Sequence, residues 1–100
     1  MATKCRLTAE PLQFEQNEYG QKVLKRVRFT ASDGGNKPER DFDLSAIDGM
    51  ILALYGDNVE KGIRTIQAIK RAEAVEVGWF EAEELEEFGF EGLNCSKDQK

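Results

Sequence analysis

Positions 32–38, which read Ser-Asp-Gly-Gly-Asn-Lys-Pro, form the strongest turn signal in the chain. Adjacent glycines accept the positive φ angles of tight turns, and proline delays the start of the strand that follows. On both sides, over 21–30 and 39–44, apolar and polar residues alternate with the period of a strand that has one buried face. The sequence therefore predicts a β-hairpin here, and with it an antiparallel sheet.

Charged residues follow the same alternation in the two predicted strands. One strand carries a basic row, and the other an acidic row: Lys22, Arg26 and Arg28 against Glu39, Asp41 and Asp43. In a hairpin these rows would face each other, and each opposite-charge pair would contribute about 0.2–1 kcal/mol. We expect the rows to neutralise one another, with Val23, Val27 and Phe29 on the core face of the first strand.

The N-terminal segment 4–14 predicts another strand with a change of phase. Its first part places Cys5, Leu7 and Ala9 on one face. After Pro11 the apolar residues move to even positions, at Leu12 and Phe14. A shift of one residue moves side chains to the opposite face, so we expect a bulge or break at Glu10-Pro11.

Helical spacing of apolar residues dominates the middle of the chain. The pattern predicts a well-buried helix over 45–55, capped by Ser45 and ended by Gly56, and a second helix over 57–71, capped by Asp57. Together these would form the central helices of the domain.

The C-terminal third predicts a late strand over 74–80 and a short acidic helix over 81–88. In the strand, Val75, Val77 and Trp79 share one face. The predicted fold class is α+β: a small antiparallel sheet of three N-terminal strands plus one late strand, packed against two central helices. We expect a single domain over 1–93 and a polar flexible tail over 94–100.

Negative charge is concentrated in this last third. Positions 72–100 hold nine acidic and two basic residues, whereas the whole chain has a net charge of −5. A surface kept only for solubility mixes both signs, and like charges at i,i+4, such as Glu83 and Glu87, repel. The imbalance indicates a surface that meets a basic partner and repels nucleic acid.

The expected partner-binding surface combines this charge with apolar anchors. Phe80 and Phe90 are the aromatic residues expected to be exposed there, with Trp79 and Phe88 in the core. The full set is Phe80, Glu81, Glu83, Glu84, Glu86, Glu87, Phe90 and Glu91. Rows of carboxylates can imitate phosphates, so the expected partner is a basic protein surface, such as that of a nucleic-acid-processing complex.

An alternative function remains open from the sequence. A nucleic-acid-binding accessory protein would use the basic rows of the second strand and the second helix: Lys22, Arg26, Arg28, Lys61, Arg64 and Arg71. That function needs these side chains on one continuous face, and its affinity would fall steeply with salt. A small structural virion protein is a third alternative, which self-association would favour.

Several kinds of chemistry are excluded or disfavoured by what the chain lacks. It has no histidine, which removes the Ser-His-Asp and Cys-His nucleophile systems and a tetrahedral zinc site. No phosphate-binding loop or metal-ligand set stands out, so we expect a non-enzymatic protein without cofactor or metal. The N-terminus lacks a signal-peptide pattern, so we expect a cytoplasmic protein with Cys5 reduced within the sheet and Cys95 facing solvent.

The chain as a whole resembles the small acidic α+β proteins that bacteriophages encode against host defences, of the anti-CRISPR and anti-restriction kinds. The resemblance rests on its size, the missing histidine and the stretch Glu81-Ala82-Glu83-Glu84-Leu85-Glu86-Glu87. It implies an inhibitor without catalysis, acting in the host-cell cytoplasm by covering a nucleic-acid-binding or partner surface.

Overall fold

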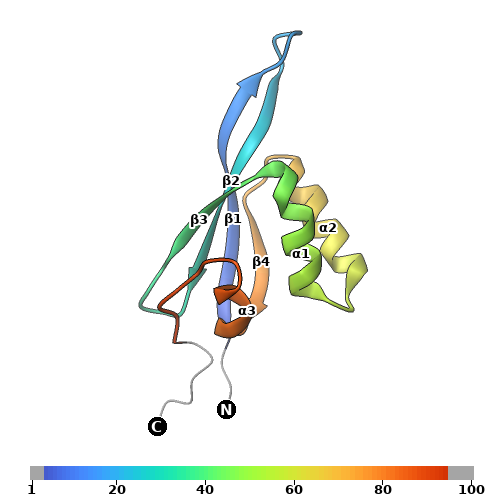
Figure 1. The fold of residues 1–100 in the computed structure, drawn as a ribbon. Coiled ribbons are helices and arrows are strands. Elements are labelled where there is room, and N and C mark those ends of the chain that lie inside the picture. Colours follow the sequence, from blue (N-terminus) through green and yellow to red (C-terminus); the bar gives the residue numbers. More distant parts are fainter. Residues whose placement is uncertain (1–3, 95–100) are drawn as a thin grey trace.

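The computed structural model describes residues 4–94, which form a four-stranded antiparallel sheet in the order β3-β2-β1-β4 with helices packed on its inner face (Figure 1). The elements are β1 (Cys5–Gln16), β2 (Lys22–Ser32), β3 (Glu39–Asp43), a 3₁₀ turn (Leu44–Ala46), α1 (Ile47–Tyr55), α2 (Val59–Lys70), β4 (Val75–Phe80) and α3 (Ala82–Glu86). The predicted α+β class is confirmed, with three N-terminal strands and one late strand. No helix among residues 4–94 is long and apolar enough to cross a membrane.

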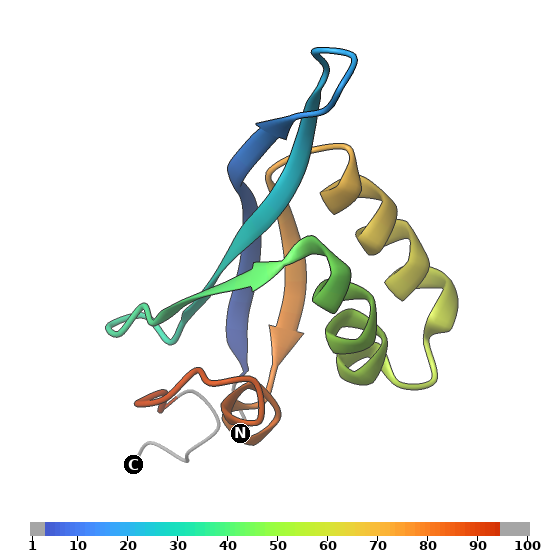
Figure 2. The same cartoon turned by 45° about the horizontal axis from the view of Figure 1, so that its top comes forward.

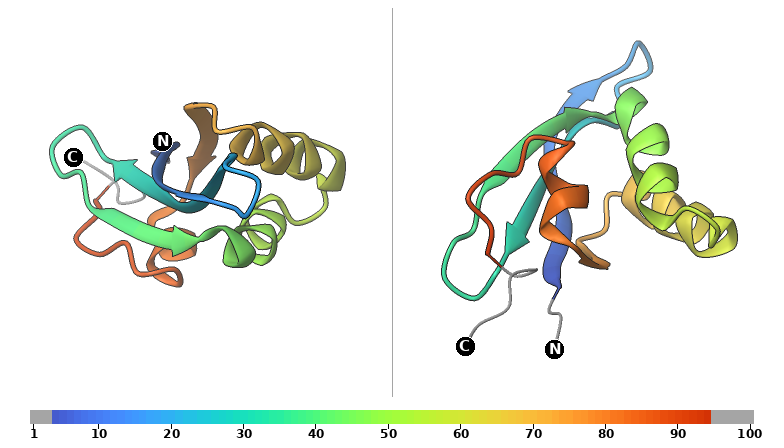
Figure 3. Two further views of the ribbon diagram at one scale, coloured as in Figure 1. Left: turned by 90° about the horizontal axis from the view of Figure 1, so that it is seen from above. Right: turned by 60° about the horizontal axis from the view of Figure 1, so that its bottom comes forward.

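One core lies between the inner face of the sheet and the helices. The sheet contributes Cys5, Leu7, Ala9, Val27, Phe29, Ala31, Val77 and Phe80, and the helical side contributes Ile47, Met50, Ile51, Leu54, Ile66, Ile69 and Leu85. The alternation seen in the sequence thus produces one buried and one open face, as is usual in antiparallel sheets. The views in Figure 3 show α1 and α2 beside the sheet, and Figure 1 shows α3 at the end of the sheet near the N-terminus.

The N-terminal caps of α1 and α2 differ from the predicted ones. Ser45 lies inside the 3₁₀ turn, and α1 begins after Ala46 without a side-chain cap. In α2 the cap is Asn58 rather than Asp57, because the Asn58 side chain accepts a hydrogen bond from the backbone N–H of Lys61. The helices themselves lie where their apolar spacing predicts.

The end of β4 has a different phase from the one predicted. Leu7 pairs with Gly78, but its neighbour Thr8 pairs with Glu76. β4 therefore has one residue more than β1 at this point, which forms a bulge at Val77-Gly78. Beyond the bulge the faces exchange: Trp79 is 55% exposed, and Phe80 is 6% exposed. The prediction that Trp79 belongs to the core is therefore wrong.

The distal part of the β1–β2 hairpin projects from the body as a two-stranded arm, residues 12–24 (Figures 1 and 2). β4 pairs with β1 only over Cys5–Ala9, and β3 pairs with β2 only over Arg26–Thr30. The arm accordingly has no third strand within residues 4–94. It accounts for the elongated shape, whose principal extents are 57 × 27 × 19 Å.

The expected irregularity in β1 is present just after the predicted position, between Pro11 and Phe14. Each strand has one extra residue there, Leu12 in β1 and Lys25 in β2, because Pro11 pairs with Val27, Gln13 with Arg26 and Phe14 with Leu24. Burial in β2 changes phase at the same place: Val27 and Leu24, three residues apart, both belong to the core, whereas Val23 is 36% exposed.

Asp33 ties the β2–β3 turn to the C-terminal segment. Its carboxylate accepts hydrogen bonds from the backbone N–H groups of Gly35 (2.8 Å), Asn36 (2.7 Å) and Asn94 (3.0 Å). The Asn36 amide in turn donates to the carbonyl of Gly92 at 2.8 Å. Hydrogen bonds from Gly35, Asn36 and Asn94 favour the ionised form and lower the pKa of Asp33.

Protonation of Asp33 at low pH should therefore weaken the hydrogen bonds that tie the β2–β3 turn to the C-terminal segment. Because the folded-state pKa of Asp33 is depressed, its stabilising effect is complete above the unfolded-state pKa of about 3.9. That effect is lost as the pH falls through the folded-state pKa. We expect wild type to have a higher urea midpoint than the Asp33→Asn variant at neutral pH, with the gap shrinking below about pH 4. A gap that stays constant from neutral to acidic pH would show that ionisation of Asp33 contributes nothing.

Cys5 is fully buried in the sheet, as predicted. It is disulfide-bonded, so the prediction of a reduced thiol is wrong. Disulfides are rare in a reducing cytoplasm, and cysteine usage therefore lends no support to a cytoplasmic location. Cys95 and most of the tail expected over 94–100 lie outside the described residues.

Candidate protein-binding surface

The acidic segment is held in place by a short helix with a polar start and an apolar anchor. The backbone N–H of Glu81 donates to the Glu84 carboxylate at 3.0 Å, which stabilises the first turn of α3. Ala82 and Leu85 are buried against the body. The backbone N–H of Phe90 donates to the carbonyl of Leu85 at 3.2 Å and turns the chain back toward the sheet. The short helix therefore has one buried side and one solvent-facing acidic side.

The carboxylates of this segment all face solvent. Those exposed are Glu81, Glu83, Glu84, Glu86, Glu87 and Glu91, and we call them the acidic face. Within residues 4–94 none of them forms an ion pair, whereas most other acidic side chains of the sheet and helices do. The exposed charge predicted from the sequence is therefore present, and no ion pair within residues 4–94 neutralises it.

A cation that the sequence did not associate with this segment lies next to it. Arg40, on the inner face of β3, passes so close to Gly89 that a Cβ at position 89 would lie 2.8 Å from its Nε. Gly89 has a φ of +99°, which also favours glycine. Residues 40 and 89 are brought together by tertiary packing alone, so no local pattern could have indicated the approach.

The two predicted aromatic anchors do not lie on the surface. Phe90 is 0% exposed, with its ring centroid 6.5 Å from that of Phe42, and Phe80 packs edge-on against Tyr55 at 5.7 Å. The prediction that Phe80 and Phe90 are exposed is wrong. The bulge in β4 turns Phe80 inward, and the return of the chain after α3 brings Phe90 over β3. Trp79, two residues before Glu81, is the exposed aromatic residue near the acidic face.

Two members of the basic row of β2, Arg26 and Arg28, are paired across the hairpin as the sequence predicted, whereas Lys22 lies beyond the part of β2 that pairs with β3. Arg28 Nε lies 3.0 Å from Asp41 Oδ1 and 3.8 Å from Glu39 Oε1, and Arg26 lies 3.8 Å from Asp43. The hydrogen bond from Arg28 lowers the pKa of Asp41, and the same contact raises the pKa of Arg28. This part of the alternative nucleic-acid surface is therefore largely neutralised.

The basic stripe of α2 is also occupied by local contacts. Arg64 pairs with Glu60 at 3.4 Å, Arg71 pairs with Glu73 at 3.0 Å, and the Lys61 ammonium lies 5.8 Å from the centre of the Tyr55 ring. α2 covers the inner face of the sheet, whereas Arg26 and Arg28 alternate with the buried Val27 and Phe29 and so belong to the outer face. The structure does not bring the two basic rows together on one continuous face.

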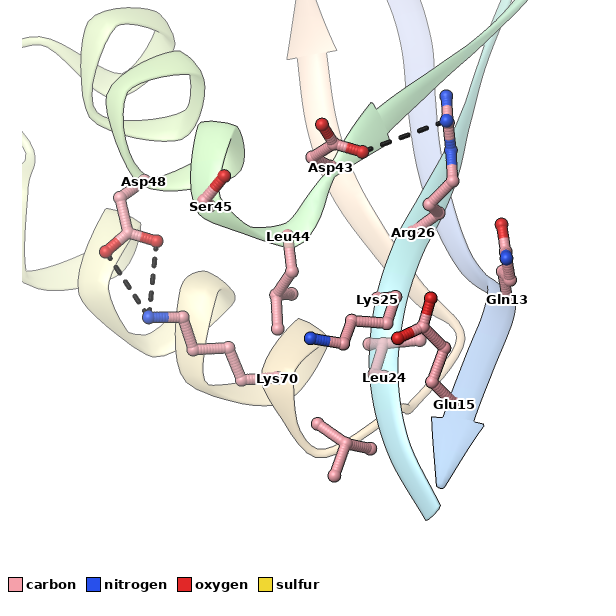
Figure 4. Close-up of a pocket in the computed structure, with 11 residues that line it drawn as sticks. Gln13, Glu15, Leu24, Lys25, Arg26, Asp43, Leu44, Ser45, Asp48 and Lys70 are labelled. Atoms are coloured by element: carbon pink, nitrogen blue, oxygen red, sulfur yellow. Dashed lines mark hydrogen bonds and ion pairs between the residues drawn. The ribbon is translucent and has the colours of Figure 1, made fainter. Parts of the chain in front are cut away.

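A shallow cavity of about 690 Å³ separates the arm from the start of α1 and the end of α2 (Figure 4). Its wall includes the ion pair Lys70–Asp48 (3.3 Å) and the pair Arg26–Asp43, with Leu24 and Leu44 between them. Charges of both signs line the wall, so the cavity has no clear preference for an anion or a cation. No sequence pattern indicated this cavity, because its residues come from six separate elements.

The described residues contain no cluster of metal-ligating side chains. Comparison with known proteins yields no relative: no family model, curated protein or solved structure matches the chain. The functional interpretation rests on the acidic face and its surroundings.

Proposed function

We propose that this protein is a non-enzymatic binding protein that presents the acidic face to a basic protein surface. The observation that carries the proposal is the exposure of six glutamates, from Glu81 to Glu91, that have no basic partner within residues 4–94. Elsewhere within residues 4–94, most acidic side chains of the sheet and helices pair with basic ones. A one-sign surface of this kind attracts a basic surface and repels nucleic acid.

The partner that fits this charge best is a nucleic-acid-binding surface. Such surfaces carry lysine and arginine side chains spaced to meet phosphates, and carboxylates can occupy the same positions. The small acidic anti-defence proteins of bacteriophages, which the chain resembles, are inhibitors that cover surfaces of this sort. We therefore assign the protein the role of an inhibitor that blocks the nucleic-acid-binding surface of a host defence complex in the host-cell cytoplasm.

Trp79 takes the place of the anchors expected from the sequence. It is 55% exposed and lies two residues before the acidic face begins. Tryptophan is enriched among the residues that dominate interface energies, because it buries a large rigid surface. The proposed contact therefore consists of Trp79 with the glutamates around α3, and it does not include Phe80 or Phe90.

Charge reversal tests the proposal. In the variant Glu83→Lys/Glu86→Lys/Glu87→Lys, Glu84 is kept because its carboxylate caps α3. We expect wild type to retain a nucleic-acid-processing complex from host lysate at low salt, and to lose it at high salt because exposed charge attraction is screened. The variant should fail to retain it even at low salt, while its circular dichroism spectrum and urea midpoint stay close to those of wild type.

A matched control separates the acidic face from net charge. The variant Glu15→Lys/Glu18→Lys/Asp57→Lys changes the net charge equally, at exposed positions outside the acidic face. It should still retain the complex. Equal retention by all three proteins, or equal loss in both variants, would refute a specific role for the acidic face. Recovery of nucleic acid by wild type would favour the basic rows instead.

A further inference from the structure

The exposed side of α1 carries no charged side chain. The exposed residues of this helix are Gly49, Leu52 and Ala53, and Leu52 is 37% exposed. A helix that is apolar on all sides is usually buried, because apolar surface is unfavourable in water. No other element within residues 4–94 covers the side of α1 and α2 that points away from the sheet (Figure 3). The exposed side of α1 is therefore an apolar surface without a cover from this part of the chain.

α2 extends this apolar surface. Val59 and Ile63, one turn apart on the same side of α2, are 50% and 45% exposed. A Cβ added at Gly62 would lie 3.2 Å from Leu52 Cδ2, so Leu52 packs on α2 beside Gly62 and close to Ile63. Contiguous exposed apolar surface usually marks an interaction site. We call the following exposed residues the helix face: Gly49, Leu52, Ala53, Val59 and Ile63.

We propose that the helix face packs against the helix face of a second copy of this chain, with the two copies of α2 antiparallel. A two-fold axis that lies in the plane of the contact and crosses α2 at right angles near Gly62 brings Ile63 of each copy against Ile63 of the other. Because Leu52 packs beside Gly62, the same axis brings Leu52 against Leu52 of the second copy. Gly49 and Ala53 are small, so the two copies of α1 can approach closely.

Charge complementarity selects a second copy in this orientation. Glu60 and Arg64 pair within one copy at 3.4 Å, and their side chains are 84% and 71% exposed. These two residues are equally far from Gly62 along α2, so the two-fold axis places Glu60 of each copy beside Arg64 of the other. The four charges then alternate in sign, and the pair within each copy is kept. A parallel arrangement would place Glu60 beside Glu60 and Arg64 beside Arg64, and these like charges would repel.

The charges beside the helix face are matched within each copy, which suits a second copy better than a strongly charged partner. Asp48, the charged residue of α1, lies 3.3 Å from the ammonium of Lys70 at the end of α2. The antiparallel arrangement also places the N-terminus of each α2 near the C-terminus of the other, where the helix dipoles attract. The helix face shares no residue with the acidic face, so this contact is independent of the proposed inhibitor function.

The small size of the helix face predicts a weak, reversible dimer. Stable interfaces use about 20–30 residues on each partner, far more than the helix face has. Sedimentation velocity of the full chain, from about 10 µM to about 1 mM, should show a monomer–dimer equilibrium. Ile63→Lys should raise the dissociation constant by about tenfold or more, because the two introduced ammonium groups would face each other at the centre of the contact.

Phe14→Lys is the matched control for Ile63→Lys. Phe14 is 42% exposed, close to the 45% of Ile63, but it lies on the arm. This variant should dimerise like wild type, and circular dichroism should show that both variants keep the fold. The proposal is overturned if wild type stays monomeric over the whole concentration range, or if Ile63→Lys and Phe14→Lys dimerise equally.

Exchange of the two exposed charges tests the complementarity without changing an apolar residue. Glu60→Arg alone and Arg64→Glu alone each place like charges beside one another across the contact, so each should dimerise more weakly than wild type. The double variant Glu60→Arg/Arg64→Glu restores the alternation and should dimerise like wild type. Single variants that dimerise as well as wild type, or a double variant that recovers nothing, would refute the antiparallel contact.

Discussion

Replacing Phe90 by alanine is expected to lower the free energy of unfolding by about 3–5 kcal/mol, the usual cost of removing a fully buried aromatic ring. Phe90 is 0% exposed and lies against Phe42, which meets Phe29 edge-on at a centroid distance of 5.4 Å. The ring thus closes the core between β3 and the segment after α3. Since small domains have a total stability of about 5–15 kcal/mol, the loss would be a large fraction of it.

Urea denaturation of Phe90→Ala beside Trp79→Ala measures this difference. Trp79 is more than half exposed, so its removal should cost about 1 kcal/mol or less. If Phe90→Ala were no more costly than Trp79→Ala, the ring would have to lie on the surface, as the sequence suggested. The expected result also means that Phe90→Ala is unsuitable for testing partner binding, because any loss of binding could come from unfolding.

The β2–β3 hairpin, at one edge of the sheet, could be predicted because its signals are local. The glycine-rich turn fixes which residues of β2 and β3 face each other. The pairs Arg26–Asp43 and Arg28–Asp41 then follow from alternation alone. Local signals also predicted α1 and α2, because apolar residues at helical spacing over about ten residues share one face in a helix but not in a strand.

The exchange of Trp79 and Phe80 could not be derived from alternation, because the bulge interrupts it. A signal was nevertheless present: Gly78 interrupts a strand rich in valine and aromatic residues, and glycine within a strand often marks a bulge. The burial of Phe90 had no such signal. It depends on contacts such as that between Asn94 and Asp33, which are 61 positions apart.

The candidate protein-binding surface could likewise be predicted only in part from local sequence signals. The glutamates of the acidic face could be predicted to be exposed, because a carboxylate without a partner is costly to bury. The choice of aromatic neighbour could not, because it depends on the phase of β4 after the bulge. The distribution of charge along the sequence therefore identified the acidic face. The path of the backbone after the bulge decides which aromatic side chain is exposed beside that face.

The bulge itself predicts a large effect at Gly78. Its φ is +154°, and a Cβ there would lie 3.1 Å and 3.2 Å from carbons of the Phe80 ring and 3.4 Å from the Tyr55 hydroxyl. That hydroxyl donates to the carbonyl of Val77, so the ring of Tyr55 is held in place. Gly78→Ala should therefore lower the free energy of unfolding by about 2–3 kcal/mol through backbone strain and crowding.

Gly49→Ala is the informative comparison, because the same added methyl group should have the opposite effect. Gly49 lies in α1, is exposed, and has no atom within 4 Å of an added Cβ. Alanine favours a helix over glycine by about 1 kcal/mol, so this variant should be more stable than wild type. Urea midpoints that move in opposite directions would establish that the bulge requires glycine. A neutral or stabilising Gly78→Ala would mean that β4 continues without a bulge, and the inward position of Phe80 would then lose its explanation.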